Sequence, residues 1–597
     1  MTQTFKKLID LLTTKERRKM YLLVFMMLIM ALLDIIGVAS ILPFMAVLTN
    51  PSLIETNLIL NNMFKFFSLF GVEDNEQFLF ASGVFVLLML IISLAFKAIT
   101  TYAQVRFVQM RQYTIGKRLV EGYLQQTYSW FLNRHSANLG KTILSEVELV
   151  VGSGLRPFMD LIAKGIVAFA LITLLIITDP KIASLVGFIL IIAYGLIFYF
   201  TRRYLIRNGE ERLINNELRF KAASEAFSAA KEVKVRGLEE IYTKRFSDPS
   251  QIVAKKMAAS ASISLLPRFF LEAIAFGGVL LLILYMMGQS GGFNNALPII
   301  SLYVFAGYRL MPALQQIYAS FSQLIVVGPS LNELHNDLKN LKPFMSNQDQ
   351  GIMSLNKSIT LKNVYYNYPN TSRTALKNIN INIDAKTTVG LVGTTGSGKT
   401  TTVDIILGLL EPQRGTLEVD GKIISKKNSR SWQHSIGYVP QHIYLTDDTV
   451  EANIAFGEKH ANINLERVEK VSKIANLHKF ICDELPEKYK TKIGERGVRL
   501  SGGQRQRIAI ARALYHDPKV LILDEATSAL DNQTEEAVMD AVNNLNKDVT
   551  IILIAHRLNT VKNCDIIFKL EKGQLVGQGT FAELINGNKK FNPTLQT

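Results

Sequence analysis

The chain has 597 residues, which is long enough for two or more domains. Hydrophobic residues make up 48% of it, and they are concentrated before about residue 330 in runs long enough to cross a bilayer as helices. The formal net charge is +16, and the basic residues lie mainly between these runs, which favours cytoplasmic membrane flanks over a nucleic-acid-binding face. The two cysteines, Cys482 and Cys564, do not support a disulfide framework.

Six membrane spans are expected in the first half of the chain. The first apolar run, at residues 21–48, is too long for the core of a signal peptide, so we expect it to remain as a transmembrane helix. The expected spans lie at about residues 20–48, 78–104, 156–178, 181–203, 261–288 and 296–326.

The connections between these spans indicate an orientation. Residues 104–157 and 203–258 are long and basic, which places them in the cytoplasm together with both termini, and they are patterned like helices. The apolar segment at residues 57–70 is too short and too interrupted to be a span. It is predicted to be either an interfacial helix on the outer membrane face or a loop helix folded onto the protein.

Ionisable residues inside spans are costly, so each is a candidate site. Two pairs stand four residues apart and can neutralise each other on one helix face: Asp160 with Lys164, and Arg268 with Glu272. Asp34, Lys97 and Arg309 have no partner nearby in the sequence.

Arg309 is of particular interest because the planar fork of arginine suits bidentate binding of phosphate. It lies between Gly307 and Pro312, two residues that loosen a helix. The alternative is that Arg309 pairs with Asp34 or Glu272 across the bundle.

A phosphate-binding loop is predicted after a polar linker into the second half. The β-branched strand at residues 389–392 feeds a G-x-x-x-x-G-K-T sequence, and a helix pattern follows at residues 403–410. Glycines permit a backbone nest around phosphate, Lys399 reaches the outer phosphates, and Thr400 can ligate Mg²⁺. The residues expected to bind ATP here are Gly393, Thr394, Thr395, Gly396, Ser397, Gly398, Lys399, Thr400 and Thr401.

A second motif, LSGGQ at residues 500–504, precedes a buried strand at residues 520–523 that ends in Asp524 and Glu525. Metal-assisted ATP hydrolysis needs such a strand, because one carboxylate can hold Mg²⁺ while the next polarises the attacking water. The adjacent Gly502 and Gly503 let backbone N–H groups approach phosphate closely and can open a helix whose positive end favours anions.

Together these motifs resemble the nucleotide-binding domain of an ATP-binding cassette (ABC) transporter, and the whole chain resembles an exporter-fold half-transporter. The resemblance implies a six-span α-helical transmembrane domain at 1–330, a linker at 331–357, and an α/β P-loop ATPase domain at 358–597. It also implies coupling helices at 128–133 and near 229–238, the second docking on a partner subunit. The resemblance further implies that Tyr368 contacts adenine and that Gln441 senses Mg²⁺. It implies that Ser501, Gly502, Gly503 and Gln504 contact the partner's ATP and that Asp531 lies in the loop crossing to the other subunit. It also implies that Asp524 binds the metal and that Glu525 and the switch histidine His556 act in catalysis.

The resemblance also predicts the cofactors and the assembly. ATP and Mg²⁺ are the expected cofactors, and no nucleic acid is expected as a partner. In this family the signature of one subunit closes the ATP bound by the other, and this chain has one P-loop and one signature. A homodimer in the bacterial inner membrane is therefore expected, unless the chain pairs with a different half-transporter.

The cargo is predicted from a narrower resemblance. Residues 32–51, 128–147 and 308–312 resemble flippases of lipid-linked oligosaccharides of the PglK type. A polyprenyl-pyrophosphate glycan needs cations for its pyrophosphate, and Arg309, Lys97 and Arg268 are the candidates. We expect Arg309→Ala to abolish flipping and to spare basal ATP hydrolysis.

Several alternatives share or replace this fold. A lipid A-type flippase also needs cations and an amphiphilic cargo, and a multidrug exporter needs an aromatic cavity. A bacteriocin exporter with a peptidase domain is disfavoured because only about 20 residues precede the first span. An importer is disfavoured because its membrane and ATPase parts usually lie on separate chains. A soluble ABC ATPase acting on nucleic acid or ribosomes conflicts with the six apolar runs.

Overall fold

The computed structural model describes all residues except 1, 50, 52, 70, 179, 271, 274–276, 278–279, 281–292, 342–350, 370, 372–373, 495–496, 526–534, 536–538, 541–547, 556–557 and 587–597. The chain forms two compact units. The membrane unit comprises Met1–Gln126 and Arg134–Pro343, and the ATPase unit comprises Thr127–Asn133 and Phe344–Thr597.

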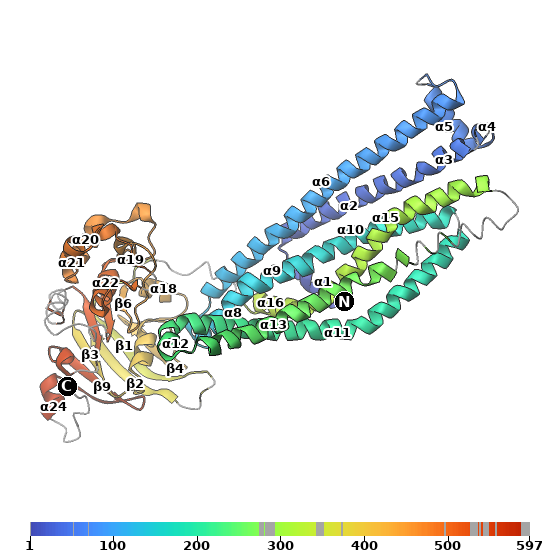
Figure 1. Ribbon diagram of the computed structural model, residues 1–597. Coiled ribbons are helices and arrows are strands. Elements are labelled where there is room, and N and C mark those ends of the chain that lie inside the picture. The colour runs from blue at the N-terminus through green and yellow to red at the C-terminus, as the bar shows by residue number, and fades with distance from the viewer. Residues whose placement is uncertain are drawn as a thin grey trace. The chain divides into compact units, whose positions relative to one another are not determined.

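Two very long helices dominate the membrane unit (Figure 1): α6 (Asn75–Leu124, 50 residues) and α11 (Pro180–Ser228, 49 residues). At about 1.5 Å per residue each measures about 75 Å, more than twice the roughly 30 Å of the hydrocarbon core of a bilayer. Each therefore continues from an apolar part into a basic connection that had a helical pattern in the sequence. The other elements of this unit are α1 (Thr2–Asp10), α2 (Thr14–Ala39), α3 (Ile41–Thr49), α4 (Leu53–Thr56), α5 (Leu58–Ser68), α8 (Ser136–Lys141), the π-helical η1 (Thr142–Glu146), α9 (Val147–Val150), the π-helical η2 (Val151–Leu155), α10 (Arg156–Thr178), α12 (Ala230–Arg236), α13 (Glu239–Leu265), α15 (Phe293–Val326) and α16 (Gly328–Asn340).

Among the described residues, four helical stretches are long and apolar enough to cross a membrane: Thr14–Leu48, Asn75–Leu124, Ser136–Thr178 and Gly187–Ser228. A fifth candidate is the pair Val304–Val326 and Gly328–Asn340, which is bent by 57° at its break. These stretches coincide with the first four and the sixth of the expected spans. Most of the expected fifth span, at residues 261–288, lies outside the described residues.

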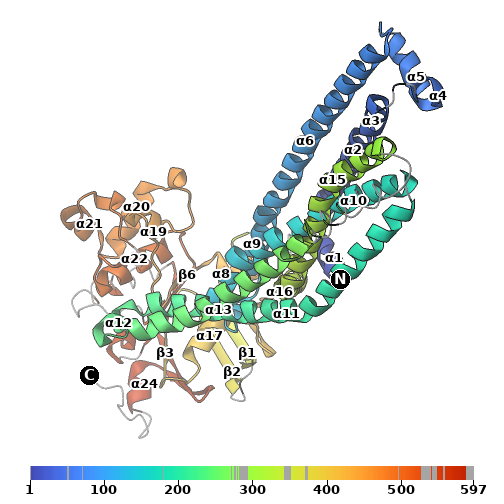
Figure 2. The same cartoon turned by 45° about the vertical axis from the view of Figure 1, so that its right-hand side comes forward.

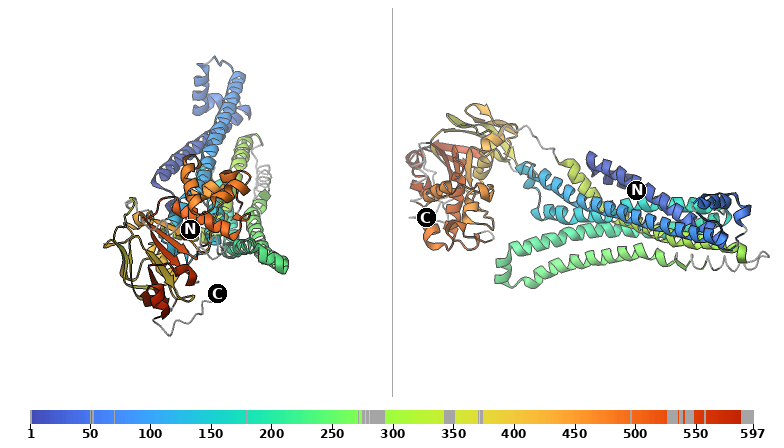
Figure 3. Two further views of the ribbon diagram at one scale, coloured as in Figure 1. Left: turned by 90° about the vertical axis from the view of Figure 1, so that its left-hand side faces the viewer. Right: turned by 90° about the horizontal axis from the view of Figure 1, so that it is seen from above.

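The membrane helices bury several polar side chains among apolar ones and expose many large apolar side chains. Helix α2 packs against α6 and α10, α10 packs against α15, and α11 lies along α13 (Figures 1, 2 and 3). On α6, Leu87, Leu88 and Ile91 are exposed, whereas Ser93 and Thr100 are buried. This inversion of the pattern of a soluble helix fits a surface that faces lipid.

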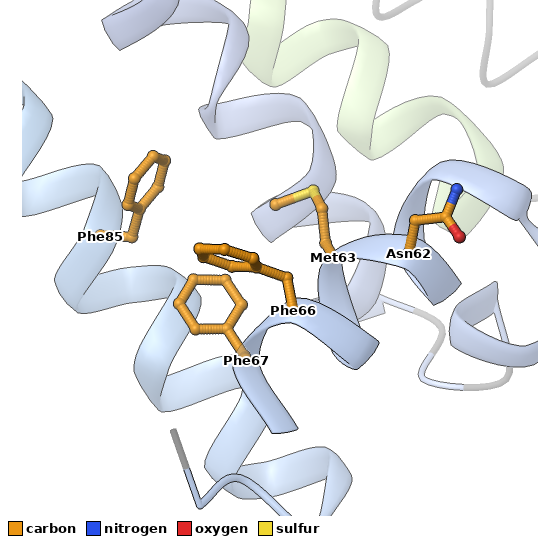
Figure 4. A pocket seen from close by; sticks show the side chains of 5 residues that line it. All are labelled: Asn62, Met63, Phe66, Phe67 and Phe85. Atoms are coloured by element: carbon orange, nitrogen blue, oxygen red, sulfur yellow. The ribbon is translucent and has the colours of Figure 1, made fainter. Parts of the chain in front are cut away.

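Helix α5 falls in the segment predicted to be interfacial or folded onto the protein. One side of the helix packs against α6, and the other side is exposed. Phe67 contacts Phe78 and Phe85 of α6 edge-to-face, with ring centroids 5.8 and 6.2 Å apart. Asn62, Met63, Phe66, Phe67 and Phe85 line a cavity of about 390 Å³ between the two helices (Figure 4). Leu58 and Leu69, in contrast, are exposed. One side of the helix is thus folded onto the protein, while its exposed side carries Leu58 and Phe66 together with the polar Asn62 and Lys65.

Short helices occupy both segments predicted to be coupling helices. Helix α7 (Tyr128–Phe131) belongs to the same compact unit as the ATPase domain. Helix α12 joins α11 to α13 and ends at Gly237, whose φ of 62° closes the turn without strain. Phe227 and Val235 are exposed at this tip. Docking of this tip on a partner subunit remains a prediction.

The ATPase unit is built on two sheets. A six-stranded sheet has the order β10-β9-β3-β8-β7-β6, with all neighbouring pairs parallel except β10 with β9. Strands β3 (Thr388–Val392), β7 (Val520–Asp524) and β8 (Thr550–Ile554) are buried throughout, as expected for a parallel sheet covered on both faces. An antiparallel sheet of order β2-β1-β4-β5 packs beside it in one hydrophobic core.

The remaining elements of this unit complete an α/β P-loop ATPase domain beside the helical membrane unit, the predicted fold class. The strands are β1 (Ser358–Asn367), β2 (Thr374–Asp384), β4 (Arg414–Val419), β5 (Lys422–Ile423), β6 (Ile436–Val439), β9 (Ile566–Glu571) and β10 (Gln574–Gly579). The helices are α17 (Lys399–Ile406), α18 (Ser429–Gln433), α19 (Val450–Ile454), η3 (His460–Asn462), α20 (Leu465–Ile474), α21 (His478–Glu484), η4 (Lys488–Lys490), α22 (Gly502–Leu514), η6 (Leu558–Val561) and α24 (Phe581–Asn586).

Candidate active site

The candidate ATP site lies where two buried strands end. Strands β3 and β7 both pair in parallel with β8, so their carboxyl ends meet at one edge of the sheet. The end of β3 leads into the loop at residues 393–398, and the end of β7 carries Asp524 and then Glu525. Ligands of open α/β sheets bind at this edge.

The loop after β3 adopts a backbone path that needs glycine at two points. Gly393 has φ 155°, and a Cβ there would lie 2.2 Å from the carbonyl oxygen of Leu570. Gly398 has φ 106°, and its Cβ would lie 2.8 Å from the side chain of Leu376. Glycine therefore lets the loop curl against the neighbouring strands and turn its N–H groups inward, as a phosphate nest requires.

Lys399 opens helix α17 and folds back over this loop. Its Nζ donates to the carbonyl oxygens of Gly393 at 2.8 Å and Thr394 at 3.2 Å. Burial lowers the pKa of Lys399, and the charges of Glu525 and Asp524 oppose that shift. The ammonium group is thus held at the loop by carbonyl groups that an outer phosphate could replace.

Two carboxylates at the end of β7 face the loop, and their hydrogen-bond donors come from β6 and the residues just after it. Gln441 Nε2 donates to Glu525 Oε2 at 2.8 Å, and Tyr438 Oη lies 3.5 Å from Asp524 Oδ2. Glu525 has φ 50°, an uncommon conformation for a residue with a side chain. The structure thus brings together Gln441, Asp524 and Glu525, three of the residues predicted for metal binding and catalysis.

The donor set of this edge fits Mg²⁺, which prefers oxygen ligands and keeps several waters. Asp524 offers a buried carboxylate at the strand end, and Thr400 offers an exposed hydroxyl in the first turn of α17. The Ser397 hydroxyl is buried and has no hydrogen-bond partner among the described residues. Such an unsatisfied group suits a loop that awaits an anion.

Two residues at this edge were not predicted from the sequence. Burial, and after it the charge of Asp524, raises the pKa of Asp404 on α17 to about 6. Burial, followed by the charges of Asp524 and Asp404, raises the pKa of Tyr438. The only sequence signal for Asp404 is a carboxylate within an apolar stretch of helix.

Tyr368 lies beside the loop and forms part of a tyrosine cluster. Its ring meets Tyr366 edge-to-face at 5.2 Å, and its Oη lies 3.1 Å from Thr401 Oγ1. Burial, and after it the charge of Asp404, raises the pKa of Tyr128 of α7. A residue of the first predicted coupling helix therefore lies within electrostatic reach of α17.

The signature sequence caps helix α22. Gln504 N–H donates to Ser501 Oγ at 3.2 Å, and Ser501 N–H donates to Gln504 Oε1 at 2.8 Å. This capping box holds Gly502 and Gly503 in the first turn, where the helix dipole favours an anion. Asp531 and His556, which were also predicted for this site, lie outside the described residues.

The three candidate cations for the cargo have different partners in the membrane unit. Arg309 forms an ion pair with the buried carboxylate of Asp34, the alternative that the sequence left open. Arg268 Nε lies 2.7 Å from Glu272 Oε1, which confirms that predicted pair. Lys97 forms no ion pair among the described residues. These contacts leave a role of the three cations in cargo binding untested.

Comparison with known proteins identifies both units. A family model described as "ABC transporter" matches residues 376–528, and one described as "ABC transporter transmembrane region" matches residues 40–308. A solved bacterial Atm1-family ABC exporter with ATP bound superimposes with a TM-score of 0.76 at 22% identity, over 96% of each chain. At that identity the likeness concerns the fold.

Full-length relatives are more similar in sequence. The ATP-dependent lipid A-core flippase of Ralstonia nicotianae is 32% identical over 480 residues, which cover 79% of each chain. The heterocyst differentiation ATP-binding protein HepA of a Nostoc species is 31% identical over 514 residues, covering 84% of this chain and 82% of that protein.

Proposed function

This chain is a member of the ABC transporter family, an exporter whose ATPase domain hydrolyses ATP to drive transport, and we propose that its cargo is an amphiphile with a phosphate-bearing headgroup. The observation that carries the proposal is the interior of the membrane unit. Charged side chains from α2, α6, α10 and α15 gather there. Burying charge in a membrane is costly, so such residues usually mark a functional site.

We assign the residues of the ATP cycle as follows. The nest at 393–398 and Lys399 hold the phosphates, and Thr400 and Asp524 would hold Mg²⁺, which neutralises charge on the transferred phosphoryl group when bound. Glu525 orients and deprotonates the attacking water, and Gln441, bonded to it at 2.8 Å, positions its carboxylate. The aromatic ring of Tyr368 offers a stacking surface for adenine.

The assembly we propose is a homodimer with two composite ATP sites. Each chain has one P-loop and one signature sequence. Ser501 and Gln504 form hydrogen bonds with each other, which leaves the N-terminus of α22 open for an anion. The exposed Phe227 and Val235 at the α12 tip offer an apolar surface for the partner subunit. ATPase domains and both termini are proposed to be cytoplasmic, in keeping with the basic connections.

Two cargo classes fit a phosphate-bearing amphiphile. A polyprenyl-pyrophosphate-linked oligosaccharide is our first candidate, because residues 32–51, 128–147 and 308–312 resemble flippases of such lipids. Lipid A is the second, because a relative that is 32% identical over 79% of the chain is named a lipid A-core flippase. Both present phosphate groups beside a large apolar tail.

The test is ATPase activity of the purified protein in nanodiscs, titrated separately with a lipid-pyrophosphate oligosaccharide, lipid A and drug-like amphiphiles. We expect stimulation by at least one of the two phosphate-bearing lipids, and the one that stimulates identifies the cargo class. Stimulation by drug-like amphiphiles alone would overturn the cargo assignment and leave the exporter assignment intact.

A further inference from the structure

A stripe of polar residues runs along the interior face of α6. Ser93, Lys97, Thr100 and Gln104 are spaced by four, three and four residues, which places all four on one face of a helix. Ser93 is 0% exposed, Thr100 1% and Gln104 8%. Lys97 stands in the middle of this stripe, so its side chain leaves the helix on the face that is turned into the bundle.

The two ends of the stripe are joined to carboxylates on neighbouring helices. Ser93 Oγ donates to Asp34 Oδ1 of α2 at 2.7 Å. Gln104 Nε2 donates to Asp160 Oδ1 of α10 at 2.5 Å. These two contacts fix which helices face the stripe, and they place Lys97 between two carboxylates.

Both carboxylates are also held from α15. Arg309 forms an ion pair with Asp34, and Gln316 Nε2 donates to Asp160 Oδ2 at 3.3 Å. The direct contacts of Asp160 are therefore two amide donors, from α6 and α15, and the charge of Lys164 acts on this carboxylate only at longer range. Each of the two carboxylates thus has hydrogen-bond donors other than a lysine.

Lys164 lies on the same layer as Lys97. Helices α6 and α10 run antiparallel (Figure 1). Lys97 lies seven residues before Gln104 on α6, and Lys164 lies four residues after Asp160 on α10. Both lysines are therefore displaced in the same direction from the contact between Gln104 and Asp160, by roughly 10 and 6 Å along their helices. Both spacings keep the side chain on its original face of the helix. Lys164 is accordingly within electrostatic range of Lys97, Asp160 and Asp34.

The ammonium groups of Lys97 and Lys164 thus lie at about the same height along the bundle, and neither forms an ion pair among the described residues. Like charges held together in a membrane interior repel each other strongly, because the low dielectric weakens their screening. An anion between them would remove that repulsion. Asp34 and Asp160 offset part of this repulsion at longer range, but both carboxylates are held by donors on α6 and α15, and neither forms an ion pair with a lysine among the described residues.

We propose that Lys97 and Lys164 form the binding site for the phosphate group of the cargo headgroup, and that Arg309 supports this site by holding Asp34 instead of contacting the cargo. The proposal rests on the proposed function above. Two compact ammonium groups with three donors each suit the two or more negative charges of a phosphate monoester or a pyrophosphate. This chemistry is shared by polyprenyl pyrophosphates and lipid A.

The test is equilibrium binding of three probes to the full-length protein in nanodiscs of neutral lipid: a polyprenyl pyrophosphate, lipid A, and the same polyprenol without phosphate. We expect Lys97→Gln and Lys164→Gln each to raise the half-saturating concentration of a phosphate-bearing probe about tenfold or more, which is the loss of one charge-assisted contact. Binding of the polyprenol should not change.

Lys117→Gln removes one positive charge from the exposed cytoplasmic part of the same helix and is the matched control. Wild-type affinity for the phosphate-bearing probes in both lysine variants, with ATP binding intact as the sign of folding, would overturn the site. If wild type binds neither phosphate-bearing probe, the proposed cargo class fails instead. Binding of one probe only, lost in the lysine variants, supports the site and identifies the source of the phosphate.

Discussion

The ATPase unit and the membrane unit both bury charged residues, but the two units neutralise them in different ways. In the ATPase unit Lys399 is held by carbonyl groups five and six residues away, within one loop. In the membrane unit Asp34 and Arg309, 275 residues apart, hold each other across the bundle. The first arrangement is local and belongs to a motif, whereas the second depends on how long helices pack. Local sites can be read from sequence, and cross-helix sites require the fold.

The largest effect is expected where the ATPase unit depends on local backbone geometry. Gly393→Ala should abolish ATP binding, because the added Cβ would lie 2.2 Å from the carbonyl oxygen of Leu570 and the loop would have to move. Gly421→Ala is the matched control, since Gly421 also has a positive φ, of 79°, but open space around it. Binding of a fluorescent ATP analogue checks both, and normal binding by Gly393→Ala would show that the loop geometry is not essential.

A large effect is also expected from the carboxylate beside the loop. Glu525→Gln keeps the size of the side chain but removes the base, so ATP turnover should fall by a factor on the order of 100 or more while ATP binding persists. Phosphate release measures turnover, and Glu484→Gln, at an exposed position on α21, controls for general loss of charge. Turnover close to that of wild type would remove Glu525 from its catalytic role.

An intermediate effect is expected from the ion pair across the membrane bundle. Arg309→Gln should destabilise the protein by about 3 kcal/mol, because it leaves the buried carboxylate of Asp34 without its cation. The double variant Asp34→Asn with Arg309→Gln should recover most of that loss. Thermal unfolding in detergent measures both. Equal melting temperatures of wild type and Arg309→Gln would argue that the pair is not structural and would favour direct contact of Arg309 with cargo.

The smallest effect is expected at a surface turn of the ATPase unit. Asp420 accepts backbone N–H groups from Asn356, Lys357 and Ser358 at 2.7–3.0 Å. Burial opposes the shift, but these bonds lower the pKa of Asp420 below the usual range of an aspartate. Because the folded-state pKa is lowered, the stabilisation is present above the unfolded-state pKa and is lost as the pH falls through the folded-state value. Asp420→Ala should cost about 1–2 kcal/mol at pH 7.

Denaturant unfolding of the full-length protein as a function of pH checks this assignment. The difference between Asp420→Ala and wild type should shrink as the pH falls below about 4. A difference that is independent of pH would show that Asp420 acts by packing and not as a charged acceptor.

The sequence predicted the local sites well and the cross-helix sites only as alternatives. The loop at 393–398 and the pair Asp524 and Glu525 could be placed because each follows directly from a buried strand and needs no distant partner. The contact of Tyr438 with Asp524 joins residues on two strands, and no spacing in the sequence indicates it.

In the membrane half the same limit is more severe. The sequence offered Asp34 as one of two partners for Arg309, and it paired Asp160 with Lys164 because they stand four residues apart on one helix. In the structure two glutamines from other helices bond directly to Asp160, and Lys164 forms no ion pair with it among the described residues. Which of several nearby donors satisfies a buried carboxylate depends on helix rotation, and the pattern of one helix does not determine it.

The central claim, that ATP hydrolysis moves a phosphate-bearing amphiphile, is tested most directly by translocation in sealed proteoliposomes. A polyprenyl pyrophosphate and lipid A would each be placed in one leaflet, and their appearance in the other would be followed with and without ATP. We predict ATP-dependent movement of at least one of them by wild type and none above background by Glu525→Gln. Movement of both lipids at the same rate with and without ATP would contradict the account.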